Sequence, residues 1–120
     1  MGAIPESFGH YLAAWNEHDP EKIRDHLAAA LADGALFVDP AHQVAGIDAI
    51  EAMIREARSA MDAEYAVVTA IDGHNRRYRY RWEVRRQGHP PIPGMDVTTI
   101  DEAGRIERID GFFGDFPPLP

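Results

Sequence analysis

Cysteine is absent from the chain, long hydrophobic runs are absent too, and positive charge is scarce. The lack of cysteine excludes disulfides and thiolate metal sites, and it fits a reducing compartment, so we expect a cytoplasmic protein. No apolar run approaches the roughly 20 residues of a membrane span, and the stretch MGAIPESFGHY has no basic segment followed by an apolar core. We therefore expect neither a membrane anchor nor a signal peptide. The net charge of −8 argues against nucleic acid as the main partner, because phosphates bind to positive surfaces.

The remaining composition is that of an ordinary globular domain. The chain has 120 residues, of which 45% are hydrophobic, and this is enough to bury a core without disulfides or metals. We expect one domain over residues 1–120, with a proline-rich tail at 117–120 and no internal repeat. Six scattered histidines share no metal-ligand spacing: His10, His18, His26, His42, His74 and His89. The sequence therefore predicts no metal site.

Apolar residues at spacings of three and four predict three helices in the first half of the chain. The first helix should end near His18. The second should begin at Asp19-Pro20, where aspartate is a favourable N-cap and proline a favourable first residue, and end with Gly34 as its C-cap. A third helix is expected over about 47–61.

Short strands account for most of the rest. A first strand, ALFVD, is expected between the second and third helices, and four more are expected in the second half, at 64–71, 76–86, 94–100 and 105–113. IDGHN and DEAG should form turns, and the prolines of GHPPIPG should keep that stretch out of any sheet. Helices followed by hairpin-linked strands indicate an α+β fold. We expect a cone-shaped, curved, mixed or antiparallel sheet whose concave face and three N-terminal helices enclose a pocket.

Alternation along the strands predicts which side chains face that pocket. In RRYRYRWEVRR the aromatic residues alternate with arginines, so the aromatic face should point inward. The arginines should lie on the outer face, solvated or against a second copy in a homodimer. The interior candidates are Tyr11, Trp15, Phe37, Asp39, Tyr80, Trp82, Asp96 and Phe113. Aromatic rings around two carboxyl groups and a phenol are typical of a small-molecule site.

Four stretches in this order carry a resemblance to a known family: YLAAWNEHDPEKI, LFVDP followed by GIDAI, YRWEV, and MDVTTIDEAGRIERIDGFF. Over about residues 8–114 the chain resembles the ketosteroid isomerase and SnoaL-like polyketide cyclase superfamily, which has the nuclear transport factor 2-like fold. The resemblance implies roles for three residues. Tyr11 falls at the oxyanion-hole tyrosine of the isomerases, Asp39 at their general base, and Asp96 at their oxyanion-hole aspartic acid.

The same resemblance extends to other activities and to the pocket wall. An aspartate close to the Asp96 position is implicated as the acid–base residue of the SnoaL-like cyclases, and limonene epoxide hydrolase also uses a pocket aspartate in this region. Phe113 stands where the isomerases have a tryptophan. Residues expected to contact substrate are Trp15, Phe37, His42, Tyr80, Trp82, Thr98 and Phe113. His42 follows Asp39 in the loop at the pocket mouth and is a candidate second acid or base.

Some features depart from the isomerases. The loop DPAHQVAG is shorter than theirs, and Tyr80 and Trp82 are bulky enough to reduce the pocket below the size of a steroid. The tyrosines that extend the isomerase hydrogen-bond network have no match on the third helix.

The resemblance implies a cofactor-independent isomerase or cyclase. It would remove a proton next to the carbonyl of a small hydrophobic, steroid- or polyketide-like ketone and stabilise the enolate, without nucleic-acid or membrane partners. Each residue also has a structural interpretation: Asp39 as the cap of the turn at Pro40, Asp96 as the partner of Arg81 or Arg108, and Tyr11 as plain core. Two other functions stay open. One is an epoxide hydrolase, which needs an inward arginine, and the other is a non-catalytic domain that binds a small molecule or stabilises a partner.

Overall fold

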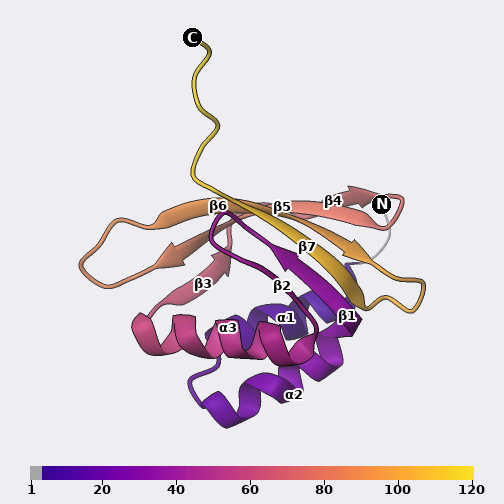
Figure 1. The fold of residues 1–120 in the computed structure, drawn as a ribbon. Helices are drawn as coiled ribbons and strands as arrows, with labels where there is room; N and C mark the ends of the chain where they lie inside the picture. Colours follow the sequence, from indigo (N-terminus) through magenta and orange to yellow (C-terminus); the bar gives the residue numbers. More distant parts are fainter. Residues whose placement is uncertain (1–3) are drawn as a thin grey trace.

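The computed structural model describes residues 4–120, so the first three residues of the stretch considered for a signal peptide lie outside the described part. Within that part the chain forms three helices: α1 (Glu6–Asn16), α2 (Pro20–Ala30) and α3 (Ile47–Ala60). It also forms a curved sheet of seven strands: β1 (Leu31–Val38), β2 (Gln43–Ala45), β3 (Glu64–Val67), β4 (Asp72–His74), β5 (Arg77–Arg85), β6 (Ile92–Ile100) and β7 (Ile106–Phe113). The helices lie against one face of this sheet (Figure 1).

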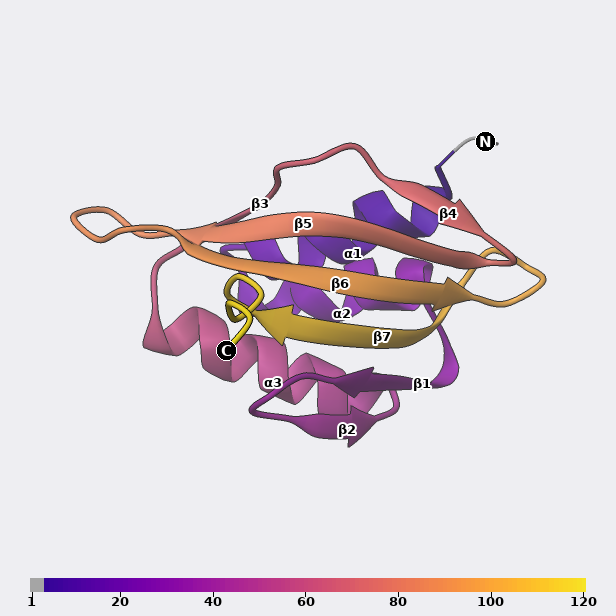
Figure 2. The ribbon, with the colours of Figure 1, turned by 90° about the horizontal axis from the view of Figure 1, so that it is seen from above.

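The sheet is mixed. Its strand order is β2-β1-β7-β6-β5-β3, and β4 pairs with β5 outside this path. All neighbours are antiparallel except β1 and β7, which run parallel and join the first half of the chain to its end. Figure 2 shows the long strands side by side with the helices beneath them. The predicted α+β fold, with three N-terminal helices and a curved mixed sheet, is therefore confirmed.

The start of α2 follows from its sequence, but its end differs from the prediction. The Asp19 carboxylate accepts a hydrogen bond of 3.0 Å from the Glu21 backbone N–H, and Pro20 is the first helical residue. The helix ends at Ala30, and Gly34 is not its cap. Instead Gly34 lies within β1, with φ of 69°, where the pairing register with β7 shifts. Glycine suits this irregularity because it adopts positive φ without strain.

The other differences concern the strands. The predicted strand 64–71 is shorter than expected, because β3 ends at Val67, and the predicted turn IDGHN is wrong in part, because Asp72–His74 form the strand β4. The predicted loop GHPPIPG contributes the start of β6, and Pro93 is tolerated there because it stands near the end of the strand, where few ladder bonds are lost. The strand β2, which pairs with β1 directly after the Asp39 turn, was not predicted.

The core lies between the helices and the sheet. Its largest fully buried side chains come from α2, α3, β6 and β7: Ile23, Leu27, Ile50, Ile54, Thr98, Ile106 and Ile109. Each buried isoleucine or leucine contributes about 1.5–3 kcal/mol. These side chains fill the core on the side of α2 and α3. Larger, aromatic side chains line the space between α1 and the strands β3, β5 and β6.

The outer face of β5 carries the arginines, as alternation predicts. Tyr80 and Val84 are buried, whereas Arg77, Arg79, Arg81 and Arg85 are exposed. Two of these arginines form exposed ion pairs, which contribute little to stability: Arg79 with Asp72 at 2.9 Å and Arg85 with Glu83 at 2.7 Å. Separately, none of the helices among residues 4–120 is long and apolar enough to cross a bilayer.

Candidate active site

A cavity of about 550 Å³ opens between α1 and the concave face of the sheet. Its volume is in the range of small-molecule sites, so Tyr80 and Trp82 line the space without filling it. Nine of the ten residues predicted for the site line this cavity: Tyr11, Trp15, Phe37, Asp39, His42, Tyr80, Trp82, Asp96 and Phe113. Thr98 lies one layer behind the wall, fully buried, where its hydroxyl is 3.0 Å from that of Tyr80.

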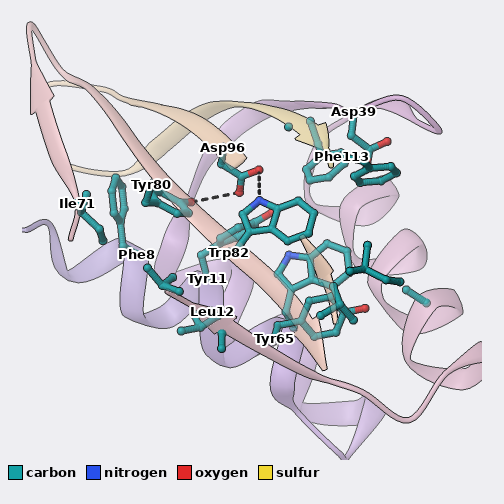
Figure 3. Close-up of a pocket in the computed structure, with 18 of the residues that line it drawn as sticks. Phe8, Tyr11, Leu12, Asp39, Tyr65, Ile71, Tyr80, Trp82, Asp96 and Phe113 are labelled. Carbon is teal, nitrogen blue, oxygen red and sulfur yellow. Dashed lines mark hydrogen bonds between the residues drawn. The ribbon is translucent and has the colours of Figure 1, made fainter. Parts of the chain in front are cut away.

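Asp96 projects from β6 into the cavity wall and is 8% exposed. The indole N–H of Trp82 donates to its Oδ1 at 2.9 Å, and the Tyr80 hydroxyl donates to its Oδ2 at 3.3 Å (Figure 3). Within the described chain no arginine pairs with it: Arg108 binds Asp110 at 2.9 Å instead. The structural interpretation of Asp96 as an ion-pair partner is therefore wrong.

Burial is the main reason why the pKa of Asp96 is raised from 3.8 to about 6. The hydrogen bonds from Trp82 and Tyr80 act in the opposite direction, because they stabilise the carboxylate, and the negative charge of Asp39 raises the pKa further. The neutral form of Asp96, which can donate a proton in a hydrogen bond, therefore predominates below a pH of about 6.

Asp39 directly follows β1, and its side chain is only 9% exposed. Its Oδ1 accepts hydrogen bonds from the backbone N–H groups of Ala41 at 2.9 Å and His42 at 2.8 Å, and the His42 Nδ1 lies 3.2 Å away. Asp39 thus caps the turn at Pro40, as the structural interpretation predicts. This does not remove it from the cavity, because every hydrogen bond that the described residues make to its side chain falls on Oδ1 and leaves Oδ2 available.

Gly111 lies beside both acids. Asp96 is its register partner on β6, and Val38, the residue before Asp39, is paired with the preceding residue of β7. A Cβ atom on Gly111 would lie 3.0 Å from Oδ1 of Asp96 and 3.4 Å from the Cβ of Asp39. Glycine therefore leaves the wall open next to the two residues, where even a methyl group would be a tight fit.

Tyr11 is buried on α1, one helical turn from Trp15, and their rings meet edge to face at 6.5 Å. Burial raises the pKa of Tyr11 well above its ordinary value, and the nearby Asp96 and Tyr80 raise it further. The phenol therefore keeps its proton and is a hydrogen-bond donor. Phe113 is half exposed at the other end of the cavity, where its ring meets Trp82 edge to face at 6.0 Å.

Two further contributions to the site were not predicted. The Asn16 side chain donates a hydrogen bond to the Tyr65 carbonyl and accepts one from the Tyr65 N–H, both at 2.8 Å. These two bonds connect β3 to the end of α1. This places the Tyr65 ring 4.8 Å from that of Trp15 in the cavity wall. Gly111 is the other residue: alternation predicts that it shares the inner face of the last strand with Phe113, but only the pairing of β7 with β1 and β6 places it beside both acids. A lone asparagine such as Asn16 carries no periodic signal.

The family comparison agrees with this architecture. The family model of the SnoaL-like domain matches residues 8–109. A crystal structure from Agrobacterium tumefaciens, named as a candidate isomerase of the SnoaL-like family, is 33% identical, with a TM-score of 0.84 over 92% of this chain and 96% of that one. A comparison with curated proteins found no match.

More distant structures share the fold. A candidate polyketide cyclase from Sinorhizobium meliloti is 20% identical, with a TM-score of 0.72 over 89% of this chain and 94% of that one. A candidate ketosteroid isomerase from Kribbella flavida is 16% identical, with a TM-score of 0.74 over 98% of this chain and 82% of that one. Because the family model covers most of the chain, the protein belongs to the SnoaL-like family, with the nuclear transport factor 2-like fold.

Proposed function

We propose that the protein is a cofactor-independent isomerase or cyclase that removes a proton next to the carbonyl group of a small apolar compound. The observation that carries the proposal is that Asp39 and Asp96, in different environments, both lie beside Gly111 and both line one aromatic cavity. Asp96 is buried and becomes neutral below about pH 6, whereas Asp39 lies at the loop that borders the cavity. Paired carboxyl groups in contrasting environments are suited to separate acid and base roles.

In this mechanism the Oδ2 of Asp39 takes the proton from carbon, because its Oδ1 is already engaged in the turn. Negative charge then develops on the carbonyl oxygen. The phenol of Tyr11 and the O–H of neutral Asp96 would donate to that oxygen. A positioned base contributes a factor of about 10²–10⁴, and one oxyanion donor is worth about 2.7–4 kcal/mol. The proton returns from Asp39 to another carbon in an isomerisation, or the enolate attacks a second carbonyl in a cyclisation.

The names of the similar proteins support this class of reaction, since they include candidate isomerases and a candidate polyketide cyclase. The charges around the cavity favour proton removal next to a carbonyl group over epoxide hydrolysis. That alternative needs an arginine between the two aspartates, and among the described residues that line the cavity there is no arginine or lysine.

Turnover of a β,γ-unsaturated ketone, such as cyclohex-3-enone, tests the proposal through the absorbance of the conjugated product. Asp39→Asn keeps the turn, because the amide oxygen still accepts from Ala41 and His42, but it removes the base. We expect its rate to fall by at least about 100-fold. Asp48→Asn, on the exposed surface of α3, is the matched control and should leave the rate unchanged. Equal rates in the wild type and Asp39→Asn would contradict the proposal, and ligand binding without turnover would favour a binding domain.

A further inference from the structure

The charges around the cavity are all of one sign. Asp39 and Asp96 line it, and the described residues of the wall include neither lysine nor arginine; His42 is the remaining titratable nitrogen, and its Nδ1 faces Asp39. The arginines of β5 lie on the opposite face of the sheet. A buried carboxylate without a cationic partner is costly, and a cation brought by a ligand would offset that cost.

Gly111 keeps the cavity wall open beside the two acids. A Cβ atom on Gly111 would lie 3.0 Å from Oδ1 of Asp96 and 3.4 Å from the Cβ of Asp39, so even a methyl group would be a tight fit. The backbone of Gly111 does not have a positive φ, so its conformation does not require glycine. The missing side chain therefore leaves Oδ1 of Asp96 uncrowded on this side.

Asp39 also has an acceptor oxygen that the protein does not use. Its side chain is nine-tenths buried and lines the cavity, yet in residues 4–120 its hydrogen-bond donors all contact Oδ1. Oδ2 is not among the fully buried unpaired atoms of the described residues, so it remains accessible. An N–H group of a ligand could donate to it.

The rest of the wall suits the apolar body of such a ligand and also its charge. Trp15 packs against Tyr65 with ring centroids 4.8 Å apart and against Phe37 at 6.3 Å, and Trp82 meets Phe113 on the side nearer the acids. Aromatic rings attract cations through their electron-rich faces, and tryptophan does so most strongly. The cavity therefore combines apolar surface, aromatic faces and two carboxyl groups.

We propose that this cavity binds apolar amines in their protonated form, with the ammonium group at the carboxyl groups of Asp39 and Asp96 and the hydrocarbon part among the aromatic rings. This is a binding activity beyond the proposed proton transfer, and it holds whether or not the protein turns over a ketone. A bound ammonium group would occupy Oδ2 of Asp39, so an amine would also compete with any substrate that needs this oxygen as a base.

Three probes of equal length test the proposal: 4-phenylbutylamine, 4-phenylbutanol and 4-phenylbutyrate, titrated near neutral pH and followed by calorimetry. All three have a phenyl group on a four-carbon chain; the amine and the alcohol differ only in the head group, and in the acid the last carbon belongs to the carboxylate. We expect the amine to bind at least about tenfold more tightly than the alcohol, which corresponds to about 1.4 kcal/mol, and the acid to bind more weakly than the alcohol. Equal affinity of the amine and the alcohol, tighter binding of the acid, or no binding of the amine would each overturn the proposal.

Variants distinguish amine binding at Asp39 and Asp96 from attraction by the overall negative charge of the protein. Asp39→Asn and Gly111→Ala should each bring the amine close to the affinity of the alcohol, the first by removing charge and the second by placing a methyl group against Oδ1 of Asp96. Asp48→Asn removes an equal charge from the exposed surface and should leave the amine preference unchanged. If Asp48→Asn weakens amine binding as much as Asp39→Asn does, the attraction comes from net charge and the proposed site is wrong. Because the readout is binding, failure of ketone turnover does not affect this result.

Discussion

The indole N–H of Trp82 donates a 2.9 Å hydrogen bond to the buried carboxyl group of Asp96. The two residues lie on neighbouring strands, where Tyr80 is the direct register partner of Asp96 and Trp82 is two residues further along the same face. This bond favours the ionised form of Asp96 and opposes the effect of burial. The two effects together leave the pKa of Asp96 at about 6. The protonation state of Asp96 therefore changes within a pH range in which the protein can be studied.

Removing this donor should shift the titration of Asp96. Trp82→Phe keeps an aromatic ring in the wall but loses the N–H group, so the pKa of Asp96 should rise above about 6. The variant should lose about 1.5–3 kcal/mol of stability where Asp96 is ionised, because a hydrogen bond to a charged group is lost, and less where Asp96 is neutral. Carboxyl carbon NMR follows the titration, and urea unfolding at about pH 5 and pH 8 measures the stability. A stability loss that is the same at both pH values would contradict this role of Trp82.

Asp96→Asn should stabilise the protein above pH 6. The folded pKa of about 6 exceeds the ordinary value of 3.8, so the folded state binds the proton more tightly and the wild type loses stability as pH rises through this window. The difference in unfolding free energy between Asp96→Asn and the wild type should therefore grow by about 2.4 kcal/mol between about pH 4 and pH 7. Urea unfolding of both proteins across this range gives the difference directly. A difference that does not change with pH would show that Asp96 is not buried as described.

Gly94 is needed for the position of Trp82. A methyl group at Gly94 would overlap the six-membered ring of Trp82 and would lie 2.7 Å from the Phe112 carbonyl oxygen. Gly94→Ala should therefore displace the indole, cost about 1–3 kcal/mol and change the tryptophan fluorescence. Gly9→Ala is the matched control: it lies within α1 with open space around it, and the change should stabilise the helix by about 0.5–1 kcal/mol. Equal effects of the two substitutions would contradict the close contact.

Asn16 should contribute more to stability than an ordinary asparagine. Asn16→Ala removes both hydrogen bonds to the Tyr65 backbone and leaves the edge of β3 unpaired, so we expect a loss of about 1–3 kcal/mol in urea unfolding. The exposed amide Gln87 is the control, and Gln87→Ala should change stability by less than about 0.5 kcal/mol. A loss of that small size in Asn16→Ala would show that β3 is held by other contacts.

The parts of the fold that depend on periodicity could be predicted from the sequence. The stripe of α1, the Asp19-Pro20 start of α2 and the alternation of β5 each follow from local spacing, and the structure has them as predicted. The end of α2 could not be predicted in this way, because Gly34 suits both a helix cap and an irregular strand. The parallel pairing of β1 with β7 decides between these two roles of Gly34, and it joins segments that lie far apart in the sequence.

The residues of the cavity could also be predicted, but their hydrogen bonds could not. Alternation and the family resemblance predict that Asp39 and Asp96 line one pocket, and both residues line the cavity in the structure. The partners of Asp96 depend on the register between β5 and β6, which places Trp82 and Tyr80 within reach and leaves Arg108 to Asp110. Register is a property of the assembled sheet, and a single strand does not reveal it.

Exchange of the protons next to a carbonyl group for deuterium tests the central claim most directly, because it detects proton removal without requiring the natural substrate. A small apolar ketone such as 4-phenylcyclohexanone, incubated with the protein in D₂O, is followed by proton NMR. We predict exchange at least about 100-fold faster than in buffer, lost in Asp39→Asn and reduced in Tyr11→Phe. Exchange that is no faster than in buffer, or equally fast with the wild type and Asp39→Asn, would contradict it.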